Sequence, residues 1–282
     1  MHTDYVQRFV CEKLDIRGRL VCLSGAWQDM LRGRGYPAPI LSLLGHTTAL
    51  NVLLGANQKG GERVTLQVQG SGPVRLLVCD CTADLRIRGM AQYEAPRAPV
   101  ASERMLLGDG RLAVTLDDPG SGRYYQSLVP LEGDSMESIF AGYLSQSEQV
   151  PSFLRLLADE RALCGLLLEK LPGADGMDAD GWNRVQHLAA TLALDETRAA
   201  QPYDLLTRLF PEELLRVFRL QAVAYHCPYD EEKVKDMLRS LGRAEVESIL
   251  AEQGEVVIRN EMCNHEYRFD ANAIAQLFAA TH

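Results

Sequence analysis

Two cysteines near the C-terminus, Cys227 and Cys263, have the surroundings of a small zinc or redox module. Each lies in a polar, turn-forming segment, and the residues between them have the pattern of a helical hairpin followed by a short strand. Such a module brings two short loops to one point, where thiolates bind a metal ion. A tetrahedral structural zinc site draws two cysteines from each loop, and here each loop has one. The pattern indicates a module with an incomplete set of thiols.

The remaining cysteines give weaker signals. Cys79 and Cys81 lie two residues apart on a predicted strand, so their side chains point to the same face, and we interpret them as structural thiols. A thiol oxidoreductase using Cys79, Cys81 or Cys227 is an alternative, but the chain has no Cys-x-x-Cys and Asp80 would raise a neighbouring thiol pKa. The others lie among apolar neighbours and are interpreted as buried, reduced thiols: Cys11, Cys22 and Cys164.

The bulk composition excludes several classes of protein. The 282 residues are 46% hydrophobic and 24% charged, which is typical of a globular chain. A net charge of −9 disfavours binding to nucleic acid, whose phosphates require a basic surface. No apolar run has the length of a membrane span, and the first residues do not resemble a signal peptide. Seven cysteines, an odd number, favour a reducing compartment. We therefore expect a cytoplasmic protein that binds neither nucleic acid nor membranes.

The N-terminal part of the chain predicts an α+β core domain of antiparallel hairpins with crossing helices. Alternating apolar residues indicate strands, and apolar residues at helical spacing indicate a buried helix after the Tyr36–Pro39 break. Asp134 or Ser135 is expected to cap a further helix. The predicted elements are two strands within 8–23, a helix over 40–56, hairpins of 63–69 with 74–81 and of 111–116 with 124–131, and a helix over 151–170.

The composition changes after Leu171, where a flexible, acidic and glycine-rich stretch is typical of a linker. Three short helices are predicted beyond it, over 182–194, 203–210 and 211–220. Helices of this length are marginal alone and depend on docking. The predicted domains are a core domain over 1–172, a helical linker domain over 173–222, and a small C-terminal α/β module over 223–282.

Several segments resemble the heat-shock protein 33 family of redox-regulated holdase chaperones. The resembling blocks include GSGPVRLLVCDC, YYQSLVPLEG and RLFPEELLRVF, followed by the module over 226–270, and they occur in family order. The resemblance implies a core domain, a helical linker domain and a C-terminal zinc domain. It also implies that four thiolates, from Cys-x-Cys and Cys-x-x-Cys, bind zinc in the reduced, inactive protein. In that family, as the resemblance implies, oxidation to two disulfides expels zinc, unfolds the C-terminal domain and destabilises the linker. The resulting client-binding form is expected to dimerise.

This sequence departs from that pattern at two of the four cysteine positions. Tyr229 stands where the second cysteine of the first pair would be, and Asn260 stands where the first cysteine of the second pair would be. Cys227 and Cys263 are therefore the remnants of the switch, and neither disulfide within a loop can form. His226 and His265 would complete a set of two cysteines and two histidines, but their offsets differ from those of the family's ligands.

Two expectations follow for the module. We expect no zinc, with Tyr229 and Asn260 filling the former site by packing and hydrogen bonds. If the fold keeps both loops around that position, one Cys227–Cys263 disulfide is geometrically possible, and it would hold the domain together instead of releasing it. Apolar packing would then have to stabilise the domain, and the candidates for its core are Leu238, Leu241, Ile249, Leu250, Ile258, Tyr267 and Phe269.

The leading functional hypothesis is an ATP-independent holdase that binds unfolding client proteins. The sequence has no nucleotide-binding, Ser-His-Asp or His-Glu-x-x-His motif, so we expect no enzyme. With an incomplete switch, we expect heat or unfolding oxidants to open the linker, or activity without oxidation, and a possible homodimer when active. A regulatory or scaffold paralogue without chaperone activity is the alternative from another class.

Overall fold

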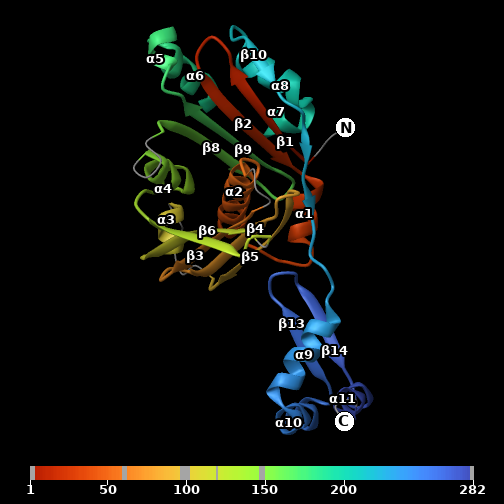
Figure 1. Cartoon of the computed structure of the whole chain (residues 1–282). Helices are drawn as coiled ribbons and strands as arrows, with labels where there is room; N and C mark the ends of the chain where they lie inside the picture. The colour runs from red at the N-terminus through yellow and green to blue at the C-terminus, as the bar shows by residue number, and fades with distance from the viewer. Residues whose placement is uncertain (1–3, 59–61, 96–101, 119, 146–149, 280–282) are drawn as a thin grey trace. The chain divides into compact units, whose positions relative to one another are not determined.

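The computed structural model describes residues 4–58, 62–95, 102–118, 120–145 and 150–279. The chain forms two compact units, Met1–His226 and Cys227–His282. Helices and mostly antiparallel sheets are mixed throughout (Figure 1), which confirms the predicted α+β class. The proposed limits at 172/173 and 222/223 stay predictions.

Two sheets dominate the larger unit. In the first, sheet A, every pair of neighbouring strands is antiparallel. In the second, sheet B, only β12 (Ala224–Tyr225) and β5 (Arg86–Tyr93) are parallel. Sheet A has the spatial order β10 (Leu215–Val217), β1 (Tyr5–Cys11), β2 (Ile16–Leu23), β9 (Leu163–Lys170), β8 (Ser152–Ala158), with β11 (Gln221–Ala222) also on β1. Sheet B has the order β12 (Ala224–Tyr225), β5 (Arg86–Tyr93), β4 (Val74–Cys81), β3 (Arg63–Gly70), β6 (Gly110–Asp118), β7 (Arg123–Pro130).

Helix α2 (Ala38–Gly55) packs between these sheets (Figure 1) and contacts strands of both. It is the one described helix long and apolar enough to cross a membrane, but most of it is buried inside the protein. Its apolar surface is therefore accounted for by the two sheets. We call the cluster around α2 the inner core; it includes Leu43, Leu50 and Leu53 of α2, Val6, Val21, Leu163 and Leu167 of sheet A, and Leu66, Val68 and Leu77 of sheet B.

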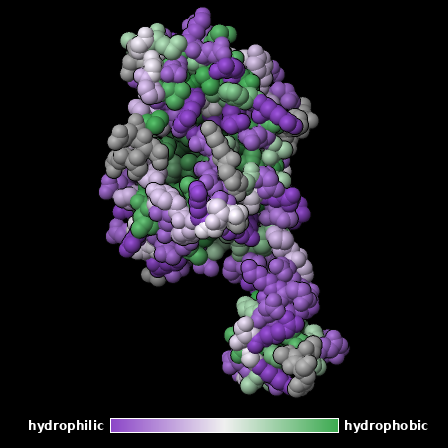
Figure 2. Space-filling view, in the orientation of Figure 1, coloured by the Kyte–Doolittle hydropathy of each residue, from purple (hydrophilic) through white to green (hydrophobic). Residues whose placement is uncertain are grey.

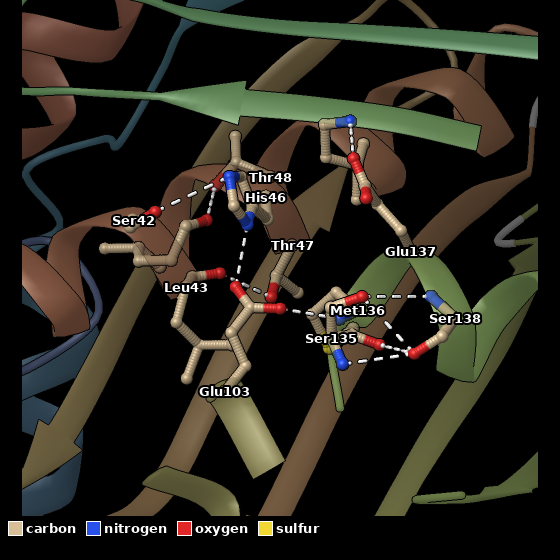
Figure 3. A network of polar contacts seen from close by, with 12 residues as sticks. Ser42, Leu43, His46, Thr47, Thr48, Glu103, Ser135, Met136, Glu137 and Ser138 are labelled. Carbon is tan, nitrogen blue, oxygen red and sulfur yellow. Dashed lines mark hydrogen bonds and ion pairs between the residues drawn. The ribbon is translucent and has the colours of Figure 1, made fainter. Parts of the chain in front are cut away.

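Glu103 joins three helices at the edge of the inner core (Figure 3). It lies in the first turn of α3 (Glu103–Leu107), and one carboxylate oxygen lies 2.7 Å from Nδ1 of His46 in α2. The other oxygen accepts a hydrogen bond from the backbone N–H of Met136, the first residue of α4 (Met136–Tyr143), at 2.6 Å. Ser135 caps α4 through its side chain, as predicted. Glu103 thus satisfies one donor at the start of α4 that would otherwise lack a partner.

A second cluster, which we call the outer core, covers the opposite face of sheet A. Alternate residues of β2 and β9 point away from α2 and pack under three short helices, α6 (Gly181–Ala190), α7 (Leu194–Ala199) and α8 (Pro202–Leu209). We call these helices the α6–α8 layer. The outer core includes Tyr5, Phe9, Leu20, Cys22, Cys164, Leu166 and Leu168 of the sheet, and Val185, Ala189, Leu205, Leu206 and Leu209 of the layer.

The predicted helix over 151–170 is wrong. The segment forms the β8–β9 hairpin, which turns where Asp159 Oδ1 accepts the N–H groups of Arg161 and Ala162 at 2.8 and 2.9 Å. Strand β9 is buried on both faces, so its side chains do not alternate between apolar and polar. A short apolar run of this kind cannot be distinguished from a buried helix by periodicity.

The helix predicted over 211–220 is also wrong. The chain there extends into β10, which pairs with β1, then into β11 on the same strand, and then into β12, which pairs with β5. The free edge of β1 supplies backbone partners that no local pattern reveals. The other predicted strands, hairpins and helices correspond to β1–β4, β6, β7, α2, α4, α6 and α8.

The smaller unit contains α9 (Glu231–Leu241), α10 (Arg243–Gln253), the hairpin of β13 (Val256–Asn260) and β14 (His265–Phe269), and α11 (Ala271–Ala279). Of the predicted core residues, Leu238, Tyr267 and Phe269 are buried, and Ile249, Leu250 and Ile258 are partly buried against them. The prediction that Leu241 belongs to this core is wrong. Its side chain is 51% exposed, because Leu241 is the last residue of α9, just before Gly242. The described helices not yet named are α1 (Gly25–Leu31) and α5 (Ala174–Met177).

Candidate redox site

The C-terminal unit positions its two cysteines with one helix start and one hairpin turn. Asp230 caps α9 by accepting the backbone N–H of Lys233 at 3.0 Å, which fixes the chain that follows Cys227. Between β13 and β14 the chain turns through Asn264, whose φ of 55° lies in the left-handed region that asparagine tolerates. The Asn264 side-chain oxygen accepts a hydrogen bond from Arg259 Nε at 3.1 Å and closes the turn. Cys263 is thereby held at the tip of the hairpin.

Cys227 and Cys263 form a disulfide with a Cα–Cα distance of 5.5 Å. Cys263 is buried and Cys227 is half-buried. The bond joins residues 36 positions apart, and the loop between them contains α9, α10 and β13. The disulfide therefore closes the small unit on itself, as the single-disulfide hypothesis required.

Tyr229 does not fill the position between the loops as a buried group. Its side chain is 58% exposed, and its ring stacks on Tyr267 with centroids 4.4 Å apart and an interplanar angle of 24°. The Tyr229 ring also lies 5.6 Å from that of His265. The buried Tyr267 accepts the backbone N–H of Asp230 through its hydroxyl oxygen at 3.1 Å. Stacking and this hydrogen bond tie the first loop to β14.

Asn260 contributes a hydrogen bond within the second loop. Its side-chain oxygen accepts the backbone N–H of Cys263 at 3.2 Å, and its backbone pairs with His265 across the hairpin. Nδ1 of His265 is buried and makes no hydrogen bond within the described part of the chain. His226 is the last residue of the larger unit; its side chain is exposed and its backbone N–H donates to the carbonyl of Ile87 at 3.0 Å.

The donor atoms of the C-terminal unit do not fit the zinc set that the resemblance implies. That set needs four thiolates, and the two sulfurs here are bonded to each other. Tyr229 and Asn260, at the two substituted positions, offer a phenol and an amide, which are not the donors of structural zinc sites. Among the described residues, no group of three or more histidine, cysteine or acidic side chains is placed to hold a metal ion.

The other predicted redox residues are poorly suited to thiol chemistry. Cys79 and Cys81 are buried in the inner core, and burial, with the nearby Asp80 adding to it, raises the pKa of each thiol to about 12. Thr48, whose hydroxyl oxygen lies 3.4 Å from the Cys79 sulfur, lowers the pKa of Cys79 by more than Asp80 raises it, but burial outweighs both. Both thiols are protonated at neutral pH and are weak nucleophiles. These two cysteines therefore serve packing.

Comparison with known proteins identifies the family. The family model described as Hsp33 protein matches residues 4–270. The chain belongs to the Hsp33 family. The 33 kDa chaperonin of Methylobacillus flagellatus is 38% identical over 278 residues, which cover 98% of this chain and 94% of the relative. That of Pseudomonas fluorescens is also 38% identical, covering 99% and 95%.

The fold of the Hsp33 family is also recognisable in three dimensions. The crystal structure of the 33 kDa chaperonin from Thermotoga maritima matches with a TM-score of 0.82 at 22% identity, covering 99% of this chain and 98% of that one. Hsp33 proteins are chaperones and not enzymes, in agreement with the predicted absence of catalysis. Cys227 and Cys263, the two cysteines singled out from the sequence, are joined in the structure, and their role in a redox switch stays a prediction. The stacking of Tyr229 on Tyr267 was not predicted, and the alternation of β14 was the available signal for it.

Proposed function

We propose that this Hsp33 protein is an ATP-independent holdase of the cytoplasm that binds unfolding proteins and opens by local unfolding, with a redox response opposite in sign to the one the family resemblance implies. The observation that carries the proposal is the Cys227–Cys263 disulfide, which crosses between the two loops. A disulfide within one loop can accompany release of the other loop, whereas this bond holds both together. Oxidation therefore closes the C-terminal unit and reduction loosens it.

The disulfide should contribute a large share of the stability of the small C-terminal unit. Closing a loop of 36 residues contributes about 3–4 kcal/mol in the chain-entropy description. The hydrophobic core of the unit is small: among the residues that the structure describes, it contains seven buried apolar side chains, which include Leu238, Val256 and Phe269. Without zinc, the reduced unit depends on this core and on the contacts of Tyr267 with Tyr229 and Asp230. We expect its reduced form to unfold locally at lower temperature than its oxidised form.

The client-binding surface we propose is the outer face of sheet A. The α6–α8 layer consists of helices of ten, six and eight residues, which depend on docking for their stability. Their release would expose a continuous apolar face that includes Phe9, Leu20 and Leu168, while the sheet itself stays paired. On the face shown in Figure 2, by contrast, hydrophobic residues are interspersed with hydrophilic ones. Large apolar patches bind non-native chains.

Suppression of client aggregation tests this function. Citrate synthase would be heated alone or with the full-length protein, either reduced with dithiothreitol or oxidised with peroxide. We expect suppression by the reduced protein, increasing with temperature, and weaker suppression by the oxidised protein. Suppression only after peroxide treatment would contradict the proposed sign of the response. No suppression in either state, with capture of native partners only, would favour the regulatory or scaffold role. Sedimentation of the active form would show whether it dimerises.

A further inference from the structure

Cys22 and Cys164 are paired across the centre of sheet A. They lie directly opposite each other on the antiparallel strands β2 and β9, with their sulfur atoms 3.3 Å apart. Opposite residues of an antiparallel pair have Cα atoms about 4.5 or 5.5 Å apart, depending on their hydrogen-bonding position. Both values lie within the range that a disulfide accepts, about 4.4–6.8 Å. The separation of the two strands is therefore compatible with a bond between these sulfurs.

Both thiols are inaccessible to solvent while the α6–α8 layer is docked on sheet A. Cys22 and Cys164 are 4% and 0% exposed, and they belong to the outer core under the α6–α8 layer. Burial raises the pKa of Cys164 well above its ordinary value, and the neighbouring Cys22 adds to that rise. A protonated thiol under a hydrophobic layer reacts slowly with oxidants. Its reactivity is thus set by whether the layer is docked.

We infer that Cys22 and Cys164 are a second, latent disulfide site, which is oxidised by a small peroxide only when the α6–α8 layer opens. Nothing in the Cys227–Cys263 site is needed for this reaction. The product would join the two strands that form the centre of sheet A while the hydrophobic cover is absent. The disulfide would persist after the layer has opened, and it would stabilise the exposed sheet against further unfolding.

The reaction balances with hydrogen peroxide as the oxidant. One thiolate attacks an oxygen of the peroxide, the O–O bond breaks, and a sulfenic acid and water are formed. The second thiolate attacks the sulfenic sulfur, the S–O bond breaks, and the leaving hydroxide takes up a proton as water. Two sulfurs lose two electrons in total, and the peroxide is reduced to two water molecules. Each thiol proton ends in one of these waters.

The chain contains its own reporters for the test. Cys11 is buried in the same outer core and has no cysteine opposite it on β2, where Ile16 is its partner. Cys79 and Cys81 are buried in the inner core. Labelling of Cys11 without Cys79 and Cys81 therefore marks an opened layer over a folded core.

The experiment is peroxide treatment of the full-length protein over a temperature series. Labelling with N-ethylmaleimide and peptide mass spectrometry would be run in parallel. The expected result is a Cys22–Cys164 peptide that accumulates at the temperatures where Cys11 becomes labelled, earlier in a Leu206→Ala variant and never in Cys22→Ser. Free or sulfinic Cys22 and Cys164 in molecules with labelled Cys11 would overturn the inference. So would formation of the bond before Cys11 labels, or labelling of Cys11 only together with Cys79. The inference rests on the layer opening that belongs to the proposed function. Labelled Cys11 without the disulfide would overturn the inference alone, whereas labelling of Cys11 only together with Cys79 would count against the layer opening itself.

Discussion

Tyr229 stacks its exposed ring on the buried ring of Tyr267, with centroids 4.4 Å apart, two residues after the disulfide-bonded Cys227. The contact lies at one of the two positions where the family resemblance implies a cysteine. The same Tyr267 receives the backbone N–H of Asp230. The first loop is therefore held to β14 by an aromatic contact and a hydrogen bond in addition to the disulfide.

Removal of this aromatic contact should destabilise the C-terminal unit modestly. Tyr229→Ala is expected to lower its free energy of unfolding by about 0.5–1.5 kcal/mol, the range for aromatic pairs. Tyr267→Phe keeps the ring and removes the acceptor of the Asp230 N–H, which costs about 1 kcal/mol. Hydrogen exchange of β13 and β14 measures both effects. Tyr229→Phe is the matched control and should behave as the parent; equal protection in Tyr229→Ala would show that the stack contributes nothing.

Loss of the disulfide should have a larger effect than loss of the stack. Cys227→Ser is expected to lower the stability of the C-terminal unit by about 3–4 kcal/mol under non-reducing conditions and to change little with reductant present. Thermal unfolding, monitored by hydrogen exchange of β13 and β14, compares the stability of the variant and the parent with and without reductant. Cys79→Ser, a buried cysteine of the larger unit, is the control for a general effect of removing a thiol. A reductant-sensitive stability in Cys227→Ser would place the redox dependence elsewhere.

Restoration of the missing thiols should restore metal binding. In the double variant Tyr229→Cys/Asn260→Cys, the cysteines would stand at the Cys-x-Cys and Cys-x-x-Cys spacings with Cys227 and Cys263. We expect the reduced variant to bind zinc stoichiometrically and the reduced parent to bind none. Atomic absorption of the purified, reduced proteins measures this directly. Equal zinc in the two proteins would mean that the parent has a metal site of different composition.

The sequence predicts those elements whose pattern is local. The alternation in β3 and the apolar helix α2 follow from residue spacing. Strand β9 has no such alternation because both of its faces are buried, and its misassignment concealed the pairing of Cys164 with Cys22. Strand β10 depends on the free edge of β1, a partner about two hundred residues away that spacing does not reveal.

Only those features of the candidate site that depend on local sequence were predictable. Cys227 and Cys263 are marked by their residue type and by flanking turns, and the resemblance places their loops together. The exposure of Tyr229 was not predictable, since a tyrosine at a former ligand position can either fill the site or leave it. The position of Tyr229 depends on the ring of Tyr267, which is available for stacking only in the folded hairpin.

Glu169 should be the most acid-sensitive group of sheet A. It accepts Arg17 Nε at 2.9 Å and also binds the buried Arg19, which donates in addition to the carbonyl of Leu53 at 3.1 Å. Burial alone would raise the pKa of Glu169, but the two guanidinium groups outweigh it and lower the pKa. A lowered carboxyl pKa contributes stability that is present above the unfolded value of about 4.3 and is lost as the pH falls through the folded value.

Replacement of that carboxylate tests its contribution to stability. Glu169→Ala leaves the buried Arg19 uncompensated, so we expect a loss of about 3–5 kcal/mol at neutral pH and a flatter decline of stability with acid. Urea unfolding at neutral and acidic pH measures both. Arg17→Ala, which removes a half-exposed partner, should cost about 1 kcal/mol or less. A neutral-pH loss in Glu169→Ala no larger than in Arg17→Ala would contradict this account.

The segment from β10 to β12 has a further consequence. One run of the main chain occupies the edge of β1 and then the edge of β5, and it continues without interruption into Cys227. Peeling this run away would leave two rows of backbone amides and carbonyls without partners, one on each sheet. The segment that leads to the smaller unit therefore also covers one edge strand of each sheet. Its detachment would expose the edges of β1 and β5, to which an extended polypeptide could add as a further strand.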